Sequence, residues 1–330
     1  KNSRVLNASM HNLFVYGIGH NAILGCKVYN DRTVQSLRSD YTISINGDNN
    51  IVKDCHVEYI AGNEGSTHGI GVRGASRLDS KYNLICNNTA ANVAQPFYIR
   101  NFGSNYNVVK DNVATVGNGV VGNNDINGLC IWGGPKYNIF ERNYINGGDG
   151  SIFLYDNNEE PYADNTVGIG NIFRNNIFAN TDSFMITWAT NVTSFDDNYI
   201  YNNTIYNNSV WWDNRDSNLT ITGLNIKNNI IIGVTSTGGS QSGMIFDYNN
   251  FYNSWTTGIG SNDININPDF VNTTDFVPSN ENLLVAPKIA GINYDYNNKE
   301  RANTTTIGGV CLLSEVGEVV PPPVYVPDYY

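Results

Sequence analysis

A short pattern of polar and apolar residues recurs along most of the chain, and it constrains the fold more than any other feature of the sequence. Each copy begins with a polar residue, usually Asn, and an apolar residue follows two positions later. Asn or Cys then stands at the sixth position and an apolar residue at the eighth. Successive copies start 24 to 33 residues apart, at Asn21, Asn50, Asn83, Asn107, Asn138, Asn171, Asn198 and Leu224. Periods of this length are typical of a solenoid and not of two compact domains.

The alternation within each copy has a period of two residues, which indicates β-strands. A single polar residue between two short strands would stand at a bend of the chain. If the coils stack about 4.8 Å apart, an Asn at that bend can bond to the Asn above and below it, because an amide both donates and accepts. Asn also tolerates the left-handed backbone of a sharp bend. We therefore predict one row of stacked asparagines, with one residue per coil.

The composition excludes several classes of protein. Only 15% of the residues are charged, against about 25% in an average soluble domain. Asn takes much of their place, and because Asn is a poor helix former this disfavours helical bundles and Rossmann-type folds. The net charge of −11 disfavours nucleic acid as a partner. The sequence has no run of 18 apolar residues, so we expect no membrane span.

Residues from about 10 to 310 resemble the right-handed parallel β-helix proteins of the pectate-lyase-like superfamily. The most specific part is Asn267-Pro268-Asp269-Phe270-Val271-Asn272, followed by Asp275-Phe276, Ala286-Pro287 and Ile307-Gly308. It is similar to the segment that closes many secreted or surface β-helix proteins, although the usual pattern has Ser where this chain has Ala286. The resemblance implies an all-β, single-domain β-helix of about nine to ten coils over residues 1–310. Residues 311–330 are Pro-rich and are expected to form an extended tail or linker.

Each coil should carry a second strand upstream of the Asn copy, and the alternation predicts which side chains of these strands point outward. Two outward columns result: Ser44, Gly71, Tyr98, Cys130 and Phe153 in one, and Asn46, Arg73, Arg100, Trp132 and Tyr155 in the other. Trp211 and Asp213 are candidates to extend them, whereas Trp188 fits only after a shift of one residue. Such a face would expose aromatic rings, and amphipathic rings suit the faces of sugars.

Arg73 and Arg100 would stand side by side on consecutive coils, where like charges repel each other. A bound carboxylate or sulfate would relieve the repulsion, and the planar guanidinium suits such an anion. Alternatively, a carboxylate of the chain itself pairs with them, Asp79 and Asp111 being the candidates.

Two catalytic readings follow from the resemblance. In β-elimination of a uronic-acid polysaccharide, Arg73 and Arg100 would neutralise the substrate carboxylate, with Tyr98 or His68 as the base. Further contacts to the sugar would come from Asn46, Trp132, Phe153 and Tyr155. Hydrolysis instead requires paired carboxylates, for which Asp213 with Asp247, or Asp182 with Asp196 or Asp197, are candidates. His68 also has the ordinary interpretation of a surface loop residue.

The sequence predicts no definite metal site. The oxygen-rich loop over residues 156–164 offers ligands that suit Ca²⁺, and a solvated acidic loop is the alternative. Cys26 and Cys55 occupy the sixth position of successive copies, which favours buried stacking over metal ligation. With five cysteines in all, the odd count leaves at least one unpaired.

Two functions remain open at this point. The first is a secreted or cell-surface β-helix protein that binds an acidic polysaccharide, with cleavage by β-elimination as the catalytic form of the same function. The second is a non-catalytic surface or filament protein, in which the β-helix is a rigid rod and the C-terminal tail is a contact for self-assembly. Eight Asn-x-Ser/Thr sequons are consistent with an extracellular glycoprotein, although chance accounts for many of them in so Asn-rich a chain.

Overall fold

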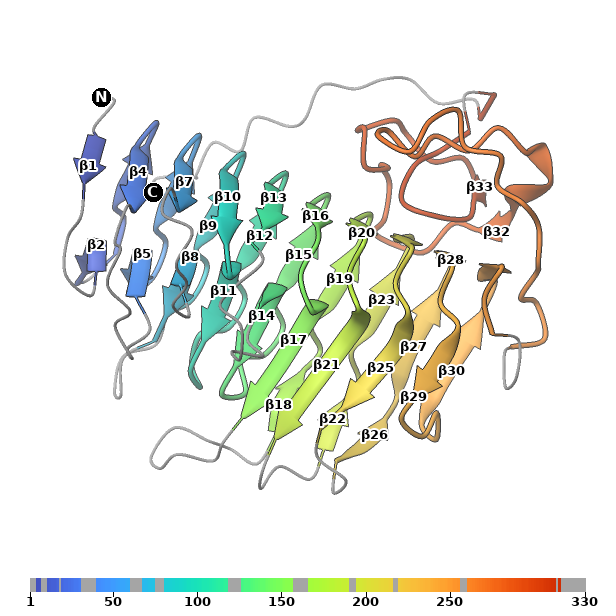
Figure 1. The fold of residues 1–330 in the computed structure, drawn as a ribbon, viewed down its shortest axis with the longest axis horizontal. Coiled ribbons are helices and arrows are strands. Elements are labelled where there is room, and N and C mark those ends of the chain that lie inside the picture. The colour runs from blue at the N-terminus through green and yellow to red at the C-terminus, as the bar shows by residue number, and fades with distance from the viewer. Residues whose placement is uncertain are drawn as a thin grey trace.

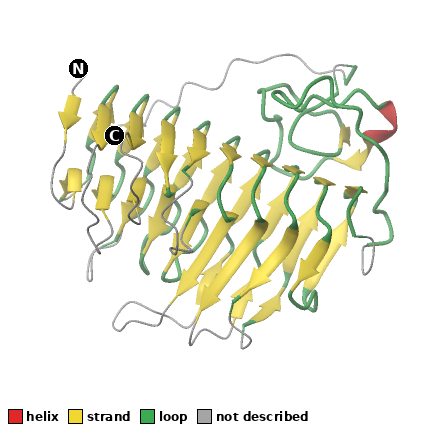
Figure 2. Ribbon diagram, in the orientation of Figure 1, coloured by secondary structure: helices red, strands yellow, loops and turns green. Residues whose placement is uncertain are grey.

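The computed structural model is a right-handed parallel β-helix, as the resemblance implied (Figures 1 and 2). The residues that it describes are 4–6, 11–17, 19–30, 40–59, 67–74, 80–117, 126–156, 166–189, 194–215, 219–255, 260–312 and 314–315. Each coil adds one strand to each of three long parallel sheets, A, B and C, in the order B, C, A. The next coil begins again with a strand of sheet B.

Three long parallel sheets form the walls of the β-helix. Sheet A contains β1 (Arg4–Leu6), β4 (Lys27–Asn30), β7 (His56–Tyr59), β10 (Thr89–Val93), β13 (Val113–Val116), β16 (Tyr144–Asn146), β20 (Ile177–Ala179), β24 (Thr204–Tyr206), β28 (Ile230–Ile232) and β31 (Asn250–Tyr252). Sheet B contains β2 (His11–Tyr16), β5 (Asp40–Asn46), β8 (Thr67–Arg73), β11 (Gln95–Arg100), β14 (Asn127–Trp132), β17 (Gly150–Asp156), β21 (Ser183–Ala189), β25 (Val210–Asn214) and β29 (Ser236–Gly238). Sheet C contains β3 (Ala22–Leu24), β6 (Ile51–Lys53), β9 (Leu84–Cys86), β12 (Val108–Lys110), β15 (Ile139–Glu141), β19 (Ile172–Arg174), β23 (Tyr199–Tyr201), β27 (Leu224–Lys227) and β30 (Met244–Asp247).

Shorter elements complete the described fold. Between sheets B and C lies a small parallel sheet of β18 (Thr166–Ile169), β22 (Ser194–Asp196) and β26 (Thr220–Thr222). Near the C-terminus, η1 (Glu281–Leu283) is a single 3₁₀ turn, and β32 (Leu284–Pro287) pairs antiparallel with β33 (Thr304–Thr306). Within the described segments, no helix has the length and apolar character that a membrane crossing requires.

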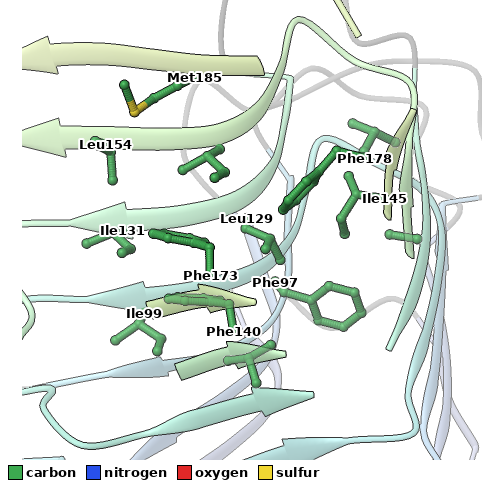
Figure 3. Close-up of a cluster of buried hydrophobic side chains, with 14 of the residues drawn as sticks. Phe97, Ile99, Leu129, Ile131, Phe140, Ile145, Leu154, Phe173, Phe178 and Met185 are labelled. Carbon is green, nitrogen blue, oxygen red and sulfur yellow. The ribbon is translucent and has the colours of Figure 1, made fainter. Parts of the chain in front are cut away.

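The core is a continuous stack of apolar side chains enclosed by the three sheets (Figure 3). Alternate residues point inward, so that equivalent positions of successive coils lie on top of one another. Phe140 and Phe173 illustrate this, with ring centroids 4.8 Å apart and planes tilted by only 8°. The period-two alternation in the sequence therefore specifies the core of this fold.

Two rows of buried asparagines follow the corners of the coils. Asn50, Asn83, Asn107, Asn138, Asn171 and Asn198 line the corner between sheets B and C, and Asn88, Asn112, Asn143, Asn176, Asn203, Asn229 and Asn249 line the corner between sheets C and A. At Asn83, for example, the backbone N–H and the side-chain Nδ2 both donate to Oδ1 of Asn107, each at 2.9 Å. The sequence led us to expect one row. The structure has two because the chain bends sharply at both corners.

The residue before most of these asparagines has a left-handed backbone. At the corner between sheets C and A this holds for Asn87, Asp111, Arg142, Asn175, Asn202, Asn228 and Tyr248, with φ between 52° and 59°. At the corner between sheets B and C it holds for His20, Asn49, Tyr82, Tyr106, Tyr137, Gly170 and Asp197, with φ between 47° and 67°. This conformation costs most L residues about 1–2 kcal/mol, and Gly and Asn adopt it most readily.

The chain after the last coil folds back over the outer face of sheet A (Figure 1, orange to red). Phe276 and Val310 pack against Ile177 of β20 in one apolar cluster, and Leu283 and Ile307 pack against Ile230 of β28 in another. Cys311, Leu312 and Glu315 are buried as well, so the packed chain continues past the predicted boundary at residue 310. Residues 316–330, which contain most of the predicted tail and its assembly contact, lie outside the described residues.

Candidate functional site

The strand register of sheet B places the predicted columns side by side. Arg100 of β11 pairs with Arg73 of β8 on one side and with Trp132 of β14 on the other. Trp132 in turn pairs with Tyr155 of β17. The other column follows the same register, in the order Ser44, Gly71, Tyr98, Cys130 and Phe153.

Beyond the first five coils, two expectations were wrong. Trp188 pairs directly with Tyr155 and needs no shift of register. Trp211 does not extend a column, because its ring is buried in the core and stacks on Phe184 with centroids 4.6 Å apart. Asp213 does continue the Tyr98 column, where it pairs with Ile186.

The expected exposure of the aromatic face was also wrong in part. Tyr98 and Phe153 are only 1% and 2% exposed, and with Cys130 and Ile186 they form an apolar cluster on the outer side of sheet B. Tyr98 is buried partly because Gly71 has no side chain: an added Cβ at Gly71 would lie only 2.5 Å from the Tyr98 ring. Tyr98 therefore lies across the neighbouring coil instead of projecting into solvent. Its hydroxyl donates to the Ile43 carbonyl oxygen at 3.4 Å.

Four residues of this face are half-buried and keep part of their surface accessible: Arg73, Arg100, Trp132 and Tyr155. The guanidinium carbon of Arg100 lies 3.7 Å from the centroid of the Trp132 ring, which is the geometry of a cation–π contact. Trp132 meets Tyr155 edge to face at 4.6 Å, and Tyr155 meets Trp188 in the same way at 5.8 Å. We call Arg73, Arg100, Trp132 and Tyr155 the Arg–Trp face.

His68 lies next to the Arg–Trp face, and its interpretation as a surface loop residue is wrong. Its side chain is fully buried, and its ring stands edge-on to Tyr98 at 5.4 Å and stacks on Trp132 at 5.9 Å. The structure thus brings together the four residues that the sequence marked as catalytic candidates, Arg73, Arg100, Tyr98 and His68.

Burial decides the protonation of Tyr98, one of the two candidate bases. Burial raises the pKa of Tyr98, and the hydrogen bond with Ser44 and the charge of Arg73 lower it by less. The net shift is upward, so the phenol stays protonated at neutral pH and is a poor base. Asn46, a predicted sugar contact, is buried like Phe153. Neither side chain presents a surface to a sugar in this conformation.

Other predicted carboxylate partners lie elsewhere. Asp111 pairs with Arg142, from Oδ1 to Nε at 2.6 Å, at the corner between sheets C and A, so it is not the partner of the Arg pair. Asp79 lies outside the described residues. Asp213 of sheet B pairs with Arg215 at 2.9 Å, whereas Asp247 stands on sheet C near Lys227. These two aspartates therefore do not form a carboxylate pair for hydrolysis.

The second pair of aspartate candidates is also separated. Asp182 precedes β21 at the corner between sheets A and B, whereas Asp196 ends β22 and Asp197 follows it on the way to sheet C. The wall of sheet B thus lies between the two positions, and the hydrolytic reading loses its second candidate.

The described residues contain no cluster of three or more His, Cys, Asp or Glu side chains that could hold a metal ion. Of the loop considered for Ca²⁺, residues 157–164 lie outside the described residues. All five cysteines are buried thiols. Burial is the largest cause that raises the pKa of Cys55 and of Cys86 to about 11, so both thiols stay protonated at neutral pH.

Sequence reasoning missed a set of exposed tyrosines at the corner between sheets B and C. Tyr82, Tyr106 and Tyr137 stack on one another, with centroids 5.6 and 5.3 Å apart and planes tilted by 15° at each step. We call them the tyrosine stack. A signal was present in the sequence, because each tyrosine directly precedes the first Asn of a repeat copy, as in Tyr82-Asn83, Tyr106-Asn107 and Tyr137-Asn138.

Comparison with known proteins supplies only resemblances of fold. Neither a family model nor a curated protein matches the chain. Among solved structures, a pectate lyase variant from Xanthomonas campestris has 16% identity and a TM-score of 0.40, with 81% of each chain covered. XylC in complex with xylose has 10% identity and a TM-score of 0.45, with 93% of this chain and 67% of the other covered. A mutant tailspike protein of E. coli bacteriophage HK620 in complex with a pentasaccharide has 12% identity and a TM-score of 0.38, with 80% and 58% covered.

Proposed function

We propose that the protein binds an acidic polysaccharide along the Arg–Trp face. The observation that carries this proposal is the Arg100 guanidinium seated on the Trp132 ring, with Arg73 in register beside it. The aromatic rings offer surface to pyranose rings, and the guanidinium groups can bind uronate carboxylates through paired hydrogen bonds.

We further propose that the protein cleaves the bound polysaccharide by β-elimination. Arg73 and Arg100 would neutralise the uronate carboxylate, which makes the proton on the adjacent carbon more acidic. His68 would accept that proton once the Trp132 ring that stacks on it moves aside, because its side chain is fully buried in this structure. The C–H electron pair would form a C=C bond, and the glycosidic oxygen would leave with its bonding electrons and take up a proton. Tyr98 is not part of this scheme because it stays protonated. We place such a protein outside the cell or at its surface, where acidic polysaccharides occur.

Binding can be tested by titrating the protein with polygalacturonate, alginate and hyaluronate, with neutral dextran as a comparison. We expect the acidic polymers alone to bind, and we expect the variant Arg73→Ala/Arg100→Ala to bind at least about tenfold more weakly. The matched control is Lys27→Ala/Lys288→Ala, which removes the same charge from positions off sheet B, in β4 and just after β32. Equal binding by both variants would contradict the proposal.

Cleavage is tested separately by following the absorbance of the unsaturated uronate product. If the chain is a lyase, His68→Ala should abolish this signal while binding of the intact polymer persists. Binding without any unsaturated product from the unaltered protein would contradict cleavage by β-elimination and leave the binding proposal in place.

A further inference from the structure

The tyrosine stack is the most exposed aromatic feature of the middle coils. Tyr82, Tyr106 and Tyr137 are 55%, 45% and 46% exposed, on three consecutive coils. Their rings lie nearly parallel, so the ring edges form a continuous strip along the axis of the β-helix. Lys136, which precedes Tyr137 in the chain, has its Nζ 5.4 Å from the centroid of the Phe102 ring.

The fold itself does not require tyrosine at this corner. All three tyrosines have a left-handed backbone, with φ of 58° or 59°, which a bulky L residue rarely adopts. In the same column, the preceding coil has Asn49 and the following coil has Gly170, and both residue types adopt this conformation more readily. Three exposed rings in strained positions suggest that the surface they create has a use.

Positive charge accompanies the stack. Lys81 directly precedes Tyr82 and Lys136 directly precedes Tyr137. Their backbone N–H groups donate to the side chains of Asp48 and Asn105, each at 2.7 Å, which fixes the corner that carries the rings. Cations beside exposed rings complement an anionic ligand with a ring-shaped apolar surface. The carboxylate of Asp48 lies at the same corner, where it accepts a hydrogen bond from the backbone N–H of Lys81.

We infer that the tyrosine stack is a second contact surface for the acidic polysaccharide of the proposed function, on which this inference rests. The ligand would lie along the β-helix axis, with sugar units against the tyrosine edges and hydroxyl groups, and with carboxylates near Lys81 and Lys136. Tyrosine suits this role because its ring is rigid and its hydroxyl group hydrogen bonds. The Arg–Trp face lies on the strands that precede the same corner, so one long chain can contact both surfaces.

Chemical protection tests this placement directly. N-acetylimidazole acetylates exposed phenols, and peptide mass spectrometry reports which tyrosines react. With the polymer that binds most tightly among polygalacturonate, alginate and hyaluronate, we expect Tyr82, Tyr106 and Tyr137 to be protected. Tyr252 is the internal control, because it is half-buried and lies in β31 at the C-terminal end of sheet A, away from both surfaces. Unchanged acetylation of the three tyrosines in the presence of bound polymer would overturn the inference.

A second measurement uses the variant Tyr82→Asn/Tyr106→Asn/Tyr137→Asn, since Asn already occupies this column at Asn49. We expect its affinity for the polymer to fall at least about tenfold, with the far-UV circular dichroism unchanged. Tyr201→Thr on β23 is the control for the loss of a tyrosine elsewhere. A variant that only melts earlier and binds as before would show that the stack is purely structural.

The two proposals fail in different ways. Loss of affinity in Arg73→Ala/Arg100→Ala alone would leave the proposed function standing and overturn this inference. Loss of affinity in the tyrosine variant alone would support the inference and show that the Arg–Trp face is not the binding site. If the unaltered protein binds none of the acidic polymers, both proposals are wrong.

Discussion

Buried amides link each coil to its neighbours at the level of single residues. Asn143 accepts hydrogen bonds from the backbone N–H and the Nδ2 of Asn112, and its own Nδ2 donates to Asn176 Oδ1 and to the Val109 carbonyl oxygen. Every one of these groups is buried, where water cannot replace a lost partner. The asparagines therefore stabilise the fold mainly by satisfying the polar groups of the corners.

Replacing one of these asparagines should be costly. We expect Asn143→Ala to lower the free energy of unfolding by about 2–4 kcal/mol, because unpaired buried donors and acceptors cost about 1–3 kcal/mol each. Asn146→Ala is the control, since Asn146 makes a more exposed bond to Asn180, and we expect it to cost less than about 1 kcal/mol. Urea unfolding followed by circular dichroism measures both variants, and equal losses would contradict this account of the row.

Gly71 is a position where a single methyl group should disturb the candidate site. A Cβ there would lie 2.4 Å from the Tyr98 carbonyl oxygen and 2.5 Å from its ring. Backbone cannot move away as a flexible side chain can, so we expect Gly71→Ala to destabilise the protein by about 1–3 kcal/mol. Ring displacement should also expose the Tyr98 phenol to acetylation. A variant with unaltered stability and an unreactive Tyr98 would argue against the close packing of this ring over Gly71.

At the level of elements, the C-terminal segment depends on a buried carboxylate. Glu315 accepts hydrogen bonds from the backbone N–H of Ala302 and Thr306 and from the hydroxyl groups of Thr305 and Thr306. Burial acts to raise the pKa of Glu315, and these hydrogen bonds lower it by more, so the net shift is downward. The ionised form is therefore the one that the folded segment favours.

This shift predicts a pH dependence of stability. Because the pKa of Glu315 is lower in the folded than in the unfolded chain, its contribution is complete above the unfolded value of about 4.3 and is lost as pH falls through the folded value. We expect Glu315→Gln to destabilise the protein at neutral pH and the difference from the unaltered protein to shrink at about pH 3. Urea unfolding at the two pH values measures this, and a difference that grows at low pH would contradict the assigned direction.

The sequence predicts the register of the strands in this fold better than the exposure of their side chains. Alternation places Ile70, Phe97 and Leu129 inside, and this fixes the register of Arg73, Arg100 and Trp132 outside. The exposure of these side chains cannot be predicted in this way, because it depends on how side chains of neighbouring coils cover one another. The sequence of a single strand does not show that the Tyr98 side chain lies across Gly71 of the neighbouring coil and is therefore buried.

At the corners, too, the sequence predicts the polar residues but not the geometry of the bends. A polar residue at a bend is visible in the sequence, as Asn83 and Asn88 are in one repeat copy. That both positions bend sharply enough to carry a buried row depends on the strand of sheet C between them, β9, being only three residues long. The sequence predicts a loop at His68, whereas this residue belongs to β8.

At the scale of the whole molecule, charge is distributed unevenly. The protein carries 30 acidic and 19 basic residues, yet Arg73, Arg100, Lys81 and Lys136 gather around the corner between sheets B and C in the middle coils. An anionic polymer thus meets long-range repulsion from the molecule as a whole and short-range attraction at this corner. The two effects differ in how strongly salt screens them, because contact pairs lie well within a Debye length and distant charges do not.

Affinity for an acidic polysaccharide should therefore pass through a maximum as ionic strength rises. At low salt the repulsion from distant carboxylates reaches the ligand and slows association. At about 0.1 M, where the Debye length is about 10 Å, this repulsion is largely screened while the arginine and lysine contacts persist. Higher salt then weakens the contacts themselves. Titrations with one polygalacturonate preparation at about 0.01, 0.1 and 0.5 M salt distinguish this from simple attraction, for which affinity would fall steadily from the lowest salt onward.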